Sequence, residues 1–194
     1  MTTIWRFSSF LIAAALAACS PEGTKFKSTD ISGAAFGREL ALTGHDGKPR
    51  TLADFRGKAV VIFFGYTHCP DICPTTLADM AGVMKQLGSD AARVQVLFVT
   101  VDPERDTPEV LAKYVPAFDP GFLGLSGDVA ATQRAAQEFK IFYEKRPGSV
   151  PTSYTVDHSG QSYVIDPQGR MRLFVRHDRI AQDLAGDLRT LLKN

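Results

Sequence analysis

Cysteine is scarce in this chain, with three residues among 194, and neither sign of charge is in excess. The 22 lysine and arginine residues balance 21 acidic residues, and no long basic run occurs. Such a balance argues against nucleic acid as a partner. The chain also shows no internal repeat and no low-complexity tract outside its polar N-terminal region, which excludes solenoid and array folds. Its length suits one domain with a substantial core.

A hydrophobic run long enough to span a membrane is also lacking. The apolar segment 8–18 follows Arg6 and is too short to cross a bilayer core of about 30 Å. We interpret residues 1–18 as a signal peptide. Leu16-Ala17-Ala18-Cys19 resembles the lipobox of bacterial lipoproteins, which implies a lipidated Cys19 as the first mature residue; the alternative is an ordinary secretory signal with a chance cysteine. In both cases we expect an extracytoplasmic protein. The lipobox further implies an anchor to a bacterial membrane, facing the periplasm.

The two remaining cysteines stand four positions apart, directly after an apolar run. In a helix or turn, the Cβ atoms of Cys69 and Cys73 would lie roughly 5–6 Å apart, a little beyond disulfide distance. A small adjustment would therefore convert a disulfide into an open dithiolate that suits a metal ion. An oxidising compartment would keep the pair oxidised unless a thiol reductant acts on it. The alternative is that both are small buried hydrophobic residues.

The apolar patterns predict an α/β domain over residues 36–194, after a flexible tether over 19–35. Residues 59–64 and 94–101 are continuous apolar runs typical of strands buried on both faces. Apolar residues fall at helical spacing over 77–87, with Gly88 as a natural stop, and further helices are predicted over 107–115 and 128–139. Asp178 is the predicted cap of a last helix. Residues 162–165 and 171–175 predict a hairpin. Together these elements predict a mixed central sheet with helices on both faces, arranged as in thioredoxin-like proteins.

A pair of thiolates selects soft ions, chiefly Cu(I), and an added imidazole suits Cu(II) as well. His68 adjoins Cys69 and would point elsewhere, while His45 and His177 are most simply solvated. His158 precedes the predicted hairpin in a segment that we expect to be a loop. From the sequence pattern, a metal ligand and a surface histidine are about equally consistent with its position.

Four motifs together resemble the Sco/SenC family, in the expected order and from about residue 36 onward: Gly65-Tyr66-Thr67-His68-Cys69-Pro70-Asp71-Ile72-Cys73-Pro74, Val101-Asp102-Pro103-Glu104-Arg105-Asp106-Thr107-Pro108, 122–127, and Val156-Asp157-His158-Ser159 with Asp166-Pro167 and Gly169. This resemblance implies a membrane-tethered, thioredoxin-like copper protein that helps to assemble the binuclear copper centre of cytochrome c oxidase. It also implies copper ligation by Cys69, Cys73 and His158. Many members use a transmembrane anchor instead of a lipid. Unlike thioredoxins, this chain separates its cysteines by three residues.

Three functions use this pair of thiols. The leading one is a copper metallochaperone whose partners are an oxidase copper-centre subunit, a copper donor protein and a thiol reductant. The second is a thiol-disulfide reductase, in which Cys69 and Cys73 are a redox-active pair that forms a disulfide when oxidised. The third is a periplasmic thiol sensor or peroxidase. Only the first requires His158. Met80 and Met84 fit the helix core better than a copper site, and a structural role is expected for Asp102, Arg105 and Asp106.

Overall fold

The most apolar part of the chain forms the middle of a central sheet. The computed structural model describes residues 25–149 and 153–193. Strand β4 (Ala59–Gly65) is buried at every position, and β5 (Val94–Thr100) at every position except Gln95. The two strands pair in parallel, with Phe63 opposite Phe98. Because protein covers both faces, these strands read as continuous apolar runs, as the sequence predicts.

Within the described residues, eight strands form this central sheet in the order β1-β10-β9-β4-β5-β6-β2-β3. β4 pairs antiparallel with β9 on its other side, so the sheet is mixed. Strands β9 and β10 form the hairpin that the sequence predicts at 162–165 and 171–175. In the turn between them, the Gly169 N–H donates a 2.7 Å hydrogen bond to the Asp166 carbonyl oxygen. The remaining strands of this sheet are β1 (Thr29–Asp30), β2 (Ala41–Gly44), β3 (Pro49–Thr51), β6 (Leu123–Ser126), β9 (Ser162–Ile165) and β10 (Met171–Val175).

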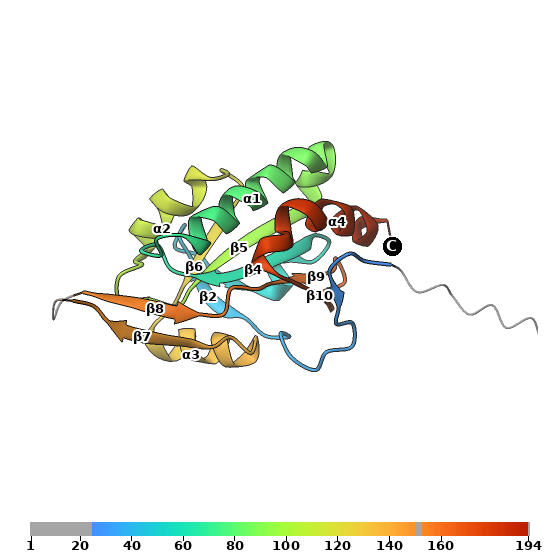
Figure 1. The fold of residues 1–194 in the computed structure, drawn as a ribbon. Helices are drawn as coiled ribbons and strands as arrows, with labels where there is room; N and C mark the ends of the chain where they lie inside the picture. The colour runs from blue at the N-terminus through green and yellow to red at the C-terminus, as the bar shows by residue number, and fades with distance from the viewer. Residues whose placement is uncertain (1–24, 150–152, 194) are drawn as a thin grey trace, which may run out of the picture.

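Helices cover both faces of the sheet, which confirms the predicted α/β architecture. Figure 1 shows α1 (Ile72–Leu87), α2 (Pro108–Tyr114) and α4 (Ala185–Leu192) on one face and α3 (Val129–Glu138) on the other. Side chains cap two of these helices: the Asp128 carboxylate accepts a 2.6 Å hydrogen bond from the Ala131 N–H, and Thr107 caps α2. Such caps satisfy N–H groups that the first helical turn leaves free.

A second, two-stranded sheet departs from the sequence prediction. Strands β7 (Tyr143–Pro147) and β8 (Tyr154–His158) form an antiparallel hairpin in which Tyr143 lies opposite His158. The hairpin projects from the main body beside α3 (Figure 1). The predicted loop before β9 is therefore wrong for His158, which is the last residue of a strand. Most hairpin side chains are polar and exposed, so no apolar pattern marks these strands.

The ends of the described chain refine two further predictions. Within the segment predicted as a tether, β1 pairs with β10, and the backbone N–H groups of Lys27 and Ser28 donate to the Asp187 carboxylate. The predicted signal peptide and Cys19 lie outside the described residues.

Asp178 does not cap the last helix: it pairs with Arg176, and a π-helical turn (Ile180–Leu184) precedes α4. In the part of the chain that the structure describes, no helix is long and apolar enough to cross a membrane.

Candidate metal centre

The two cysteines lie where β4 ends and α1 begins. Cys69 is in the connecting loop and is half-buried, whereas Cys73 is in the first turn of α1 and fully buried. Gly65, at the end of β4, leaves space for the buried sulfur, because a Cβ atom there would lie 2.8 Å from Cys73 Sγ. Below the loop, the buried Asp106 carboxylate accepts hydrogen bonds from the Thr67 N–H at 3.0 Å and the Thr67 hydroxyl at 2.6 Å. The loop is therefore held in place from beneath.

The hairpin brings His158 to the cysteines although it lies far along the chain. His158 Nε2 is 3.4 Å from Cys73 Sγ, across a separation of 85 residues. The three candidate ligand atoms, from Cys69, Cys73 and His158, all lie within 4.8 Å of one another. The structure thus assembles the three residues that the sequence analysis selected.

The imidazole is oriented to offer Nε2 to a metal. His158 Nδ1 is 3.0 Å from the Ser159 carbonyl oxygen, and because a carbonyl only accepts hydrogen bonds, Nδ1 carries the proton. Nε2 then keeps its lone pair in the neutral ring. The rings of Phe63 and Tyr66 meet the imidazole edge to face, with centroids at 6.1 and 5.8 Å. A polar contact and two aromatic contacts therefore set the tautomer and the ring plane.

The pKa values of the two thiols are shifted in opposite directions. A hydrogen bond from Cys73 lowers the pKa of Cys69 from 9.0 to about 3, against the opposing effect of burial. The backbone N–H of Cys73 also approaches Cys69 Sγ at 3.5 Å, so this sulfur takes a capping position at the start of α1. The same side-chain hydrogen bond, together with burial, raises the pKa of Cys73 above its ordinary value. The pair in this state is one accessible thiolate and one buried thiol.

This set of ligands defines which ions fit. Two sulfurs and one imidazole nitrogen suit soft or borderline ions, whereas calcium and magnesium require oxygen ligands. Apolar rings beside the imidazole limit access of water to the site. No disulfide joins Cys69 and Cys73 in this structure, so both sulfurs are available to a metal.

The other histidines stay outside this cluster. His68 is mostly exposed and lies beside Thr67 and Asp106, consistent with its weaker ranking. His45 is not simply solvated as predicted, because its Nδ1 accepts a 3.0 Å hydrogen bond from the Gly124 N–H. His177 is exposed near Gly160. A sequence pattern alone does not reveal the His45 contact, since Gly124 is 79 residues away.

The methionines and the acidic loop behave as expected. Met80 is fully buried in the core, and Met84 packs against the core from a partly buried position. Asp102 pairs with Arg105, and both Asp102 and Asp106 are fully buried. The predicted structural role of this loop is confirmed. The sequence analysis missed Tyr154, which joins this pair from β8 through a 2.8 Å hydrogen bond from its hydroxyl to Asp102.

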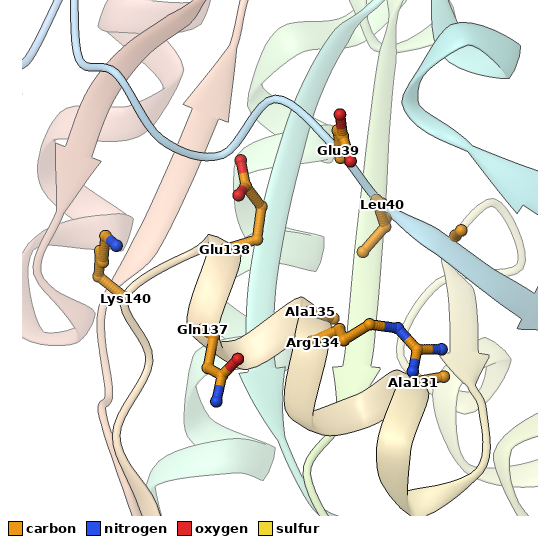
Figure 2. A pocket seen from close by; sticks show the side chains of 9 residues that line it. Glu39, Leu40, Ala131, Arg134, Ala135, Gln137, Glu138 and Lys140 are labelled. Atoms are coloured by element: carbon orange, nitrogen blue, oxygen red, sulfur yellow. The ribbon is translucent and has the colours of Figure 1, made fainter.

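A groove elsewhere on the molecule lacks metal-binding character. It has a volume of about 410 Å³ and lies between α3 and the segment that leads into β2 (Figure 2). Side chains of both signs line it: Glu39, Arg134, Glu138 and Lys140. It contains neither thiol nor imidazole, so it offers no ligand of the kind found at the cysteine loop.

Comparison with known proteins relates this chain to one family. The SCO1/SenC family model matches residues 28–193. Protein SCO2 homolog, mitochondrial, from Homo sapiens is 38% identical over 153 residues, covering 78% of this chain and 58% of the relative. The chain spans 58–60% of the length of the mouse, human and bovine relatives of this name.

Solved structures give the same result for the fold. The structure of Bradyrhizobium japonicum ScoI with copper bound has a TM-score of 0.75 and 39% identity, and the match covers 81% of this chain and 100% of that chain. Apo Sco1 from Thermus thermophilus also has a TM-score of 0.75 and 39% identity, with 87% and 97% covered. The thioredoxin-like fold is therefore confirmed. With the family model matching most of its length, the chain belongs to the SCO1/SenC family.

Proposed function

We propose that this protein is a copper metallochaperone for the binuclear copper (CuA) centre of cytochrome c oxidase. Copper is its cargo, and Cys69, Cys73 and His158 are the proposed ligands. The observation that carries the proposal is the convergence of two sulfurs and one imidazole nitrogen within 4.8 Å. Two sulfurs suit Cu(I), and the imidazole extends the site to Cu(II). Copper is bound in the Bradyrhizobium japonicum relative and in a yeast Sco1 structure that is 30% identical to this chain.

The acidity of the sulfurs supports capture of copper at neutral pH. Metal ligands must be deprotonated, and the lowered pKa of Cys69 provides one thiolate before the metal arrives. Cys73 gives up its proton on binding. We therefore expect the site to release about one proton per copper at pH 7 from its sulfurs.

A titration with copper tests the proposal. The reduced mature chain, purified in detergent, is expected to bind one Cu(I) or one Cu(II) and to show thiolate-to-Cu(II) charge-transfer absorption. His158→Ala should retain Cu(I) on the two sulfurs and lose most Cu(II) binding. His68→Ala is the matched control, because His68 adjoins Cys69 and lies outside the cluster. Equal Cu(II) binding by the two variants would contradict the proposed ligand set.

A thiol-disulfide reductase is the second candidate, favoured by the unequal sulfurs. An accessible thiolate at Cys69 and a buried thiol at Cys73 are suited to attack on a disulfide followed by resolution. The two functions differ in their need for His158. In cells, His158→Ala should impair oxidase assembly if copper delivery is the function. Normal oxidase activity in that variant, with activity lost in Cys69→Ser, would favour the reductase.

We further propose that the mature chain is attached to a bacterial membrane by a lipid on Cys19 and faces the periplasm. The lipobox-like segment supports this, as does a 26% identical SCO1/SenC family lipoprotein from Bacillus anthracis. In this proposal residues 1–18 are removed, and the segment 19–35 leads from the lipid into the domain, with β1 already paired to the central sheet. Residues 36–194 form the rest of the thioredoxin-like domain. Mass spectrometry of the mature N-terminus should find an acylated cysteine. An unmodified N-terminus, or release from membranes without detergent, would contradict the anchor.

A further inference from the structure

The proposed imidazole ligand belongs to a part of the fold with little backbone support from the central sheet. Among the described residues, β8 pairs only with β7, and neither strand pairs with the eight-stranded sheet. The chain rejoins that sheet at Ser162, which lies opposite Phe63. His158 is thus tied to the sheet at one end of β8, and the position of the rest of the strand depends on side-chain contacts.

Three residues, Asp102, Arg105 and Tyr154, fasten the other end of β8, and we call them the Arg105 clamp. Arg105 Nη1 donates to the Tyr154 carbonyl oxygen at 3.0 Å, and Arg105 Nε donates to the Asp102 carboxylate. The guanidinium also lies 3.6 Å from the centroid of the Tyr154 ring. Because the Tyr154 hydroxyl donates to Asp102, the three contacts form a closed ring around a fully buried carboxylate.

The same loop supports the cysteine segment. Asp106 bonds Thr67, which stands two residues before Cys69, and it also accepts a 2.7 Å hydrogen bond from the Thr100 hydroxyl at the end of β5. The backbone N–H of Asp102 donates a 2.9 Å hydrogen bond to the oxygen of the same Thr100 hydroxyl. One short loop, 101–106, is therefore joined to both halves of the candidate centre. Its internal geometry sets the distance between the sulfurs and the strand that carries the imidazole.

We propose that Arg105 and Tyr154 are positioning residues that hold His158 at the sulfurs and thereby set how tightly the site binds Cu(II) relative to Cu(I). The inference rests on the proposed copper-binding function. Its physical basis is the unequal need of the two ions for the imidazole: Cu(I) is satisfied by two sulfurs, whereas Cu(II) requires the nitrogen. A small displacement of β8 would therefore weaken the binding of Cu(II) and leave the binding of Cu(I) nearly unchanged.

Two conservative substitutions test the clamp in the full mature chain. Tyr154→Phe keeps the ring beneath the guanidinium and removes one hydrogen bond to the buried carboxylate. Arg105→Lys keeps the charge and removes the forked geometry. We expect each to weaken Cu(II) binding by about 10-fold, the scale of one hydrogen bond to a charged group, and Cu(I) binding by less than about 2-fold. The Cu(II) charge-transfer band should shift or lose intensity.

The matched control breaks an exposed contact between the same loop and the other strand of the hairpin. Glu104 on the loop pairs with Lys145 on β7 at 2.5 Å, and both side chains are about half exposed. Glu104→Gln removes this pair and is expected to leave both copper affinities unchanged, since exposed pairs contribute little. If Glu104→Gln lost as much Cu(II) affinity as Tyr154→Phe, the positioning of His158 could not be assigned to the Arg105 clamp.

A second background separates positioning from general loss of structure. In His158→Ala, the clamp has no imidazole to position, so adding Tyr154→Phe should change Cu(II) binding no further. A further loss in that background, or equal losses for Cu(I) and Cu(II), would refute the inference. Thermal unfolding of the metal-free variants shows whether each one folds, and Tyr154→Phe serves if Arg105→Lys does not. Failure of the parent chain to bind copper would instead refute the proposed function.

Discussion

The sulfur side and the imidazole side of the candidate centre differ in how they are built. Cys69 and Cys73 follow β4, which is buried throughout and paired with strands on both sides. His158 ends a polar hairpin fastened by side chains. Backbone ladders in a close-packed core resist displacement, whereas the hairpin is held by a few side-chain contacts around one buried carboxylate. In the proposed site, the sulfurs therefore provide a fixed base and the imidazole is the more easily displaced ligand.

The largest expected effect concerns the sulfur side and its acidity. Because the folded pKa of Cys69 lies far below 9.0, its thiolate persists as the pH falls and is lost only near pH 3. The alkylation rate of Cys69 in the reduced, metal-free protein should therefore stay nearly constant between about pH 5 and 8. For an ordinary thiol with a pKa of 9.0, the alkylation rate would fall about 10-fold for each pH unit over this range.

Cys73→Ala isolates the cause of this acidity. Removing the hydrogen-bond donor should raise the pKa of Cys69, so that its alkylation rate increases steeply with pH. Iodoacetamide labelling followed by mass spectrometry measures both profiles. A flat profile in Cys73→Ala would mean that His158 and the backbone N–H groups at the start of α1, and not the second thiol, stabilise the thiolate.

Asp106→Asn should destabilise the fixed side by about 2 kcal/mol, the scale of an unsatisfied buried polar group. The carboxylate accepts bonds from the Thr67 N–H and two hydroxyls, and an amide NH₂ has no acceptor role to replace one oxygen. Denaturant unfolding measures the loss. Asp71→Asn is the control, because Asp71 is exposed and makes no side-chain bond to cap α1. Similar midpoints for the two variants would count against the support from Asp106.

Gly65→Ala should destabilise by about 1–3 kcal/mol through overpacking. The added Cβ would meet Cys73 Sγ at 2.8 Å and the Phe98 ring at 2.9 Å. Gly82→Ala is a contrasting control within α1, since nothing lies within 4 Å of its new Cβ. That change should stabilise the helix by about 0.5–1 kcal/mol. A neutral Gly65→Ala variant would show that the fixed side accommodates volume more easily than its burial indicates.

The smallest effect is expected on the hairpin surface. Glu104→Ala breaks the pair with Lys145 and should change the free energy of unfolding by less than about 1 kcal/mol. Raising the salt concentration should reduce even this difference. A loss above 2 kcal/mol, measured by denaturant unfolding, would mean that the exposed pair, and not the buried clamp, fastens the hairpin.

The same difference explains what the sequence predicts and what it does not. The strands at 59–65 and 94–100 and the hairpin at 162–175 carry apolar runs and turn residues, so local patterns identify them. The strands of the polar hairpin carry no such signal. Its position is decided by contacts such as Arg105 to Tyr154, across 49 residues, which no local pattern contains. The sequence predicts a last helix after residue 178, but no local pattern marks the π-helical turn with which it starts.

The candidate ligands divide in the same way. The spacing of Cys69 and Cys73 and the strand before them predict a site from the residues themselves. The position of His158 in the sequence is equally consistent with an ordinary surface histidine. Only the resemblance of its segment to the family motif identifies it as a candidate ligand. The structure adds the reason for its suitability, which is the tautomer fixed by the Ser159 carbonyl.

Unequal access to the two sulfurs has a consequence for the order of copper exchange. Cys73 is closed off from solvent, while Cys69 is partly open. Under the proposed function, a donor protein that presents copper at the surface would therefore reach Cys69 first, and the inner sulfur and the imidazole would complete the site afterwards. Release to an acceptor would use the same opening, so Cys69 would be the ligand shared with both partners during transfer. The ligands that each partner contributes would then decide the direction of transfer.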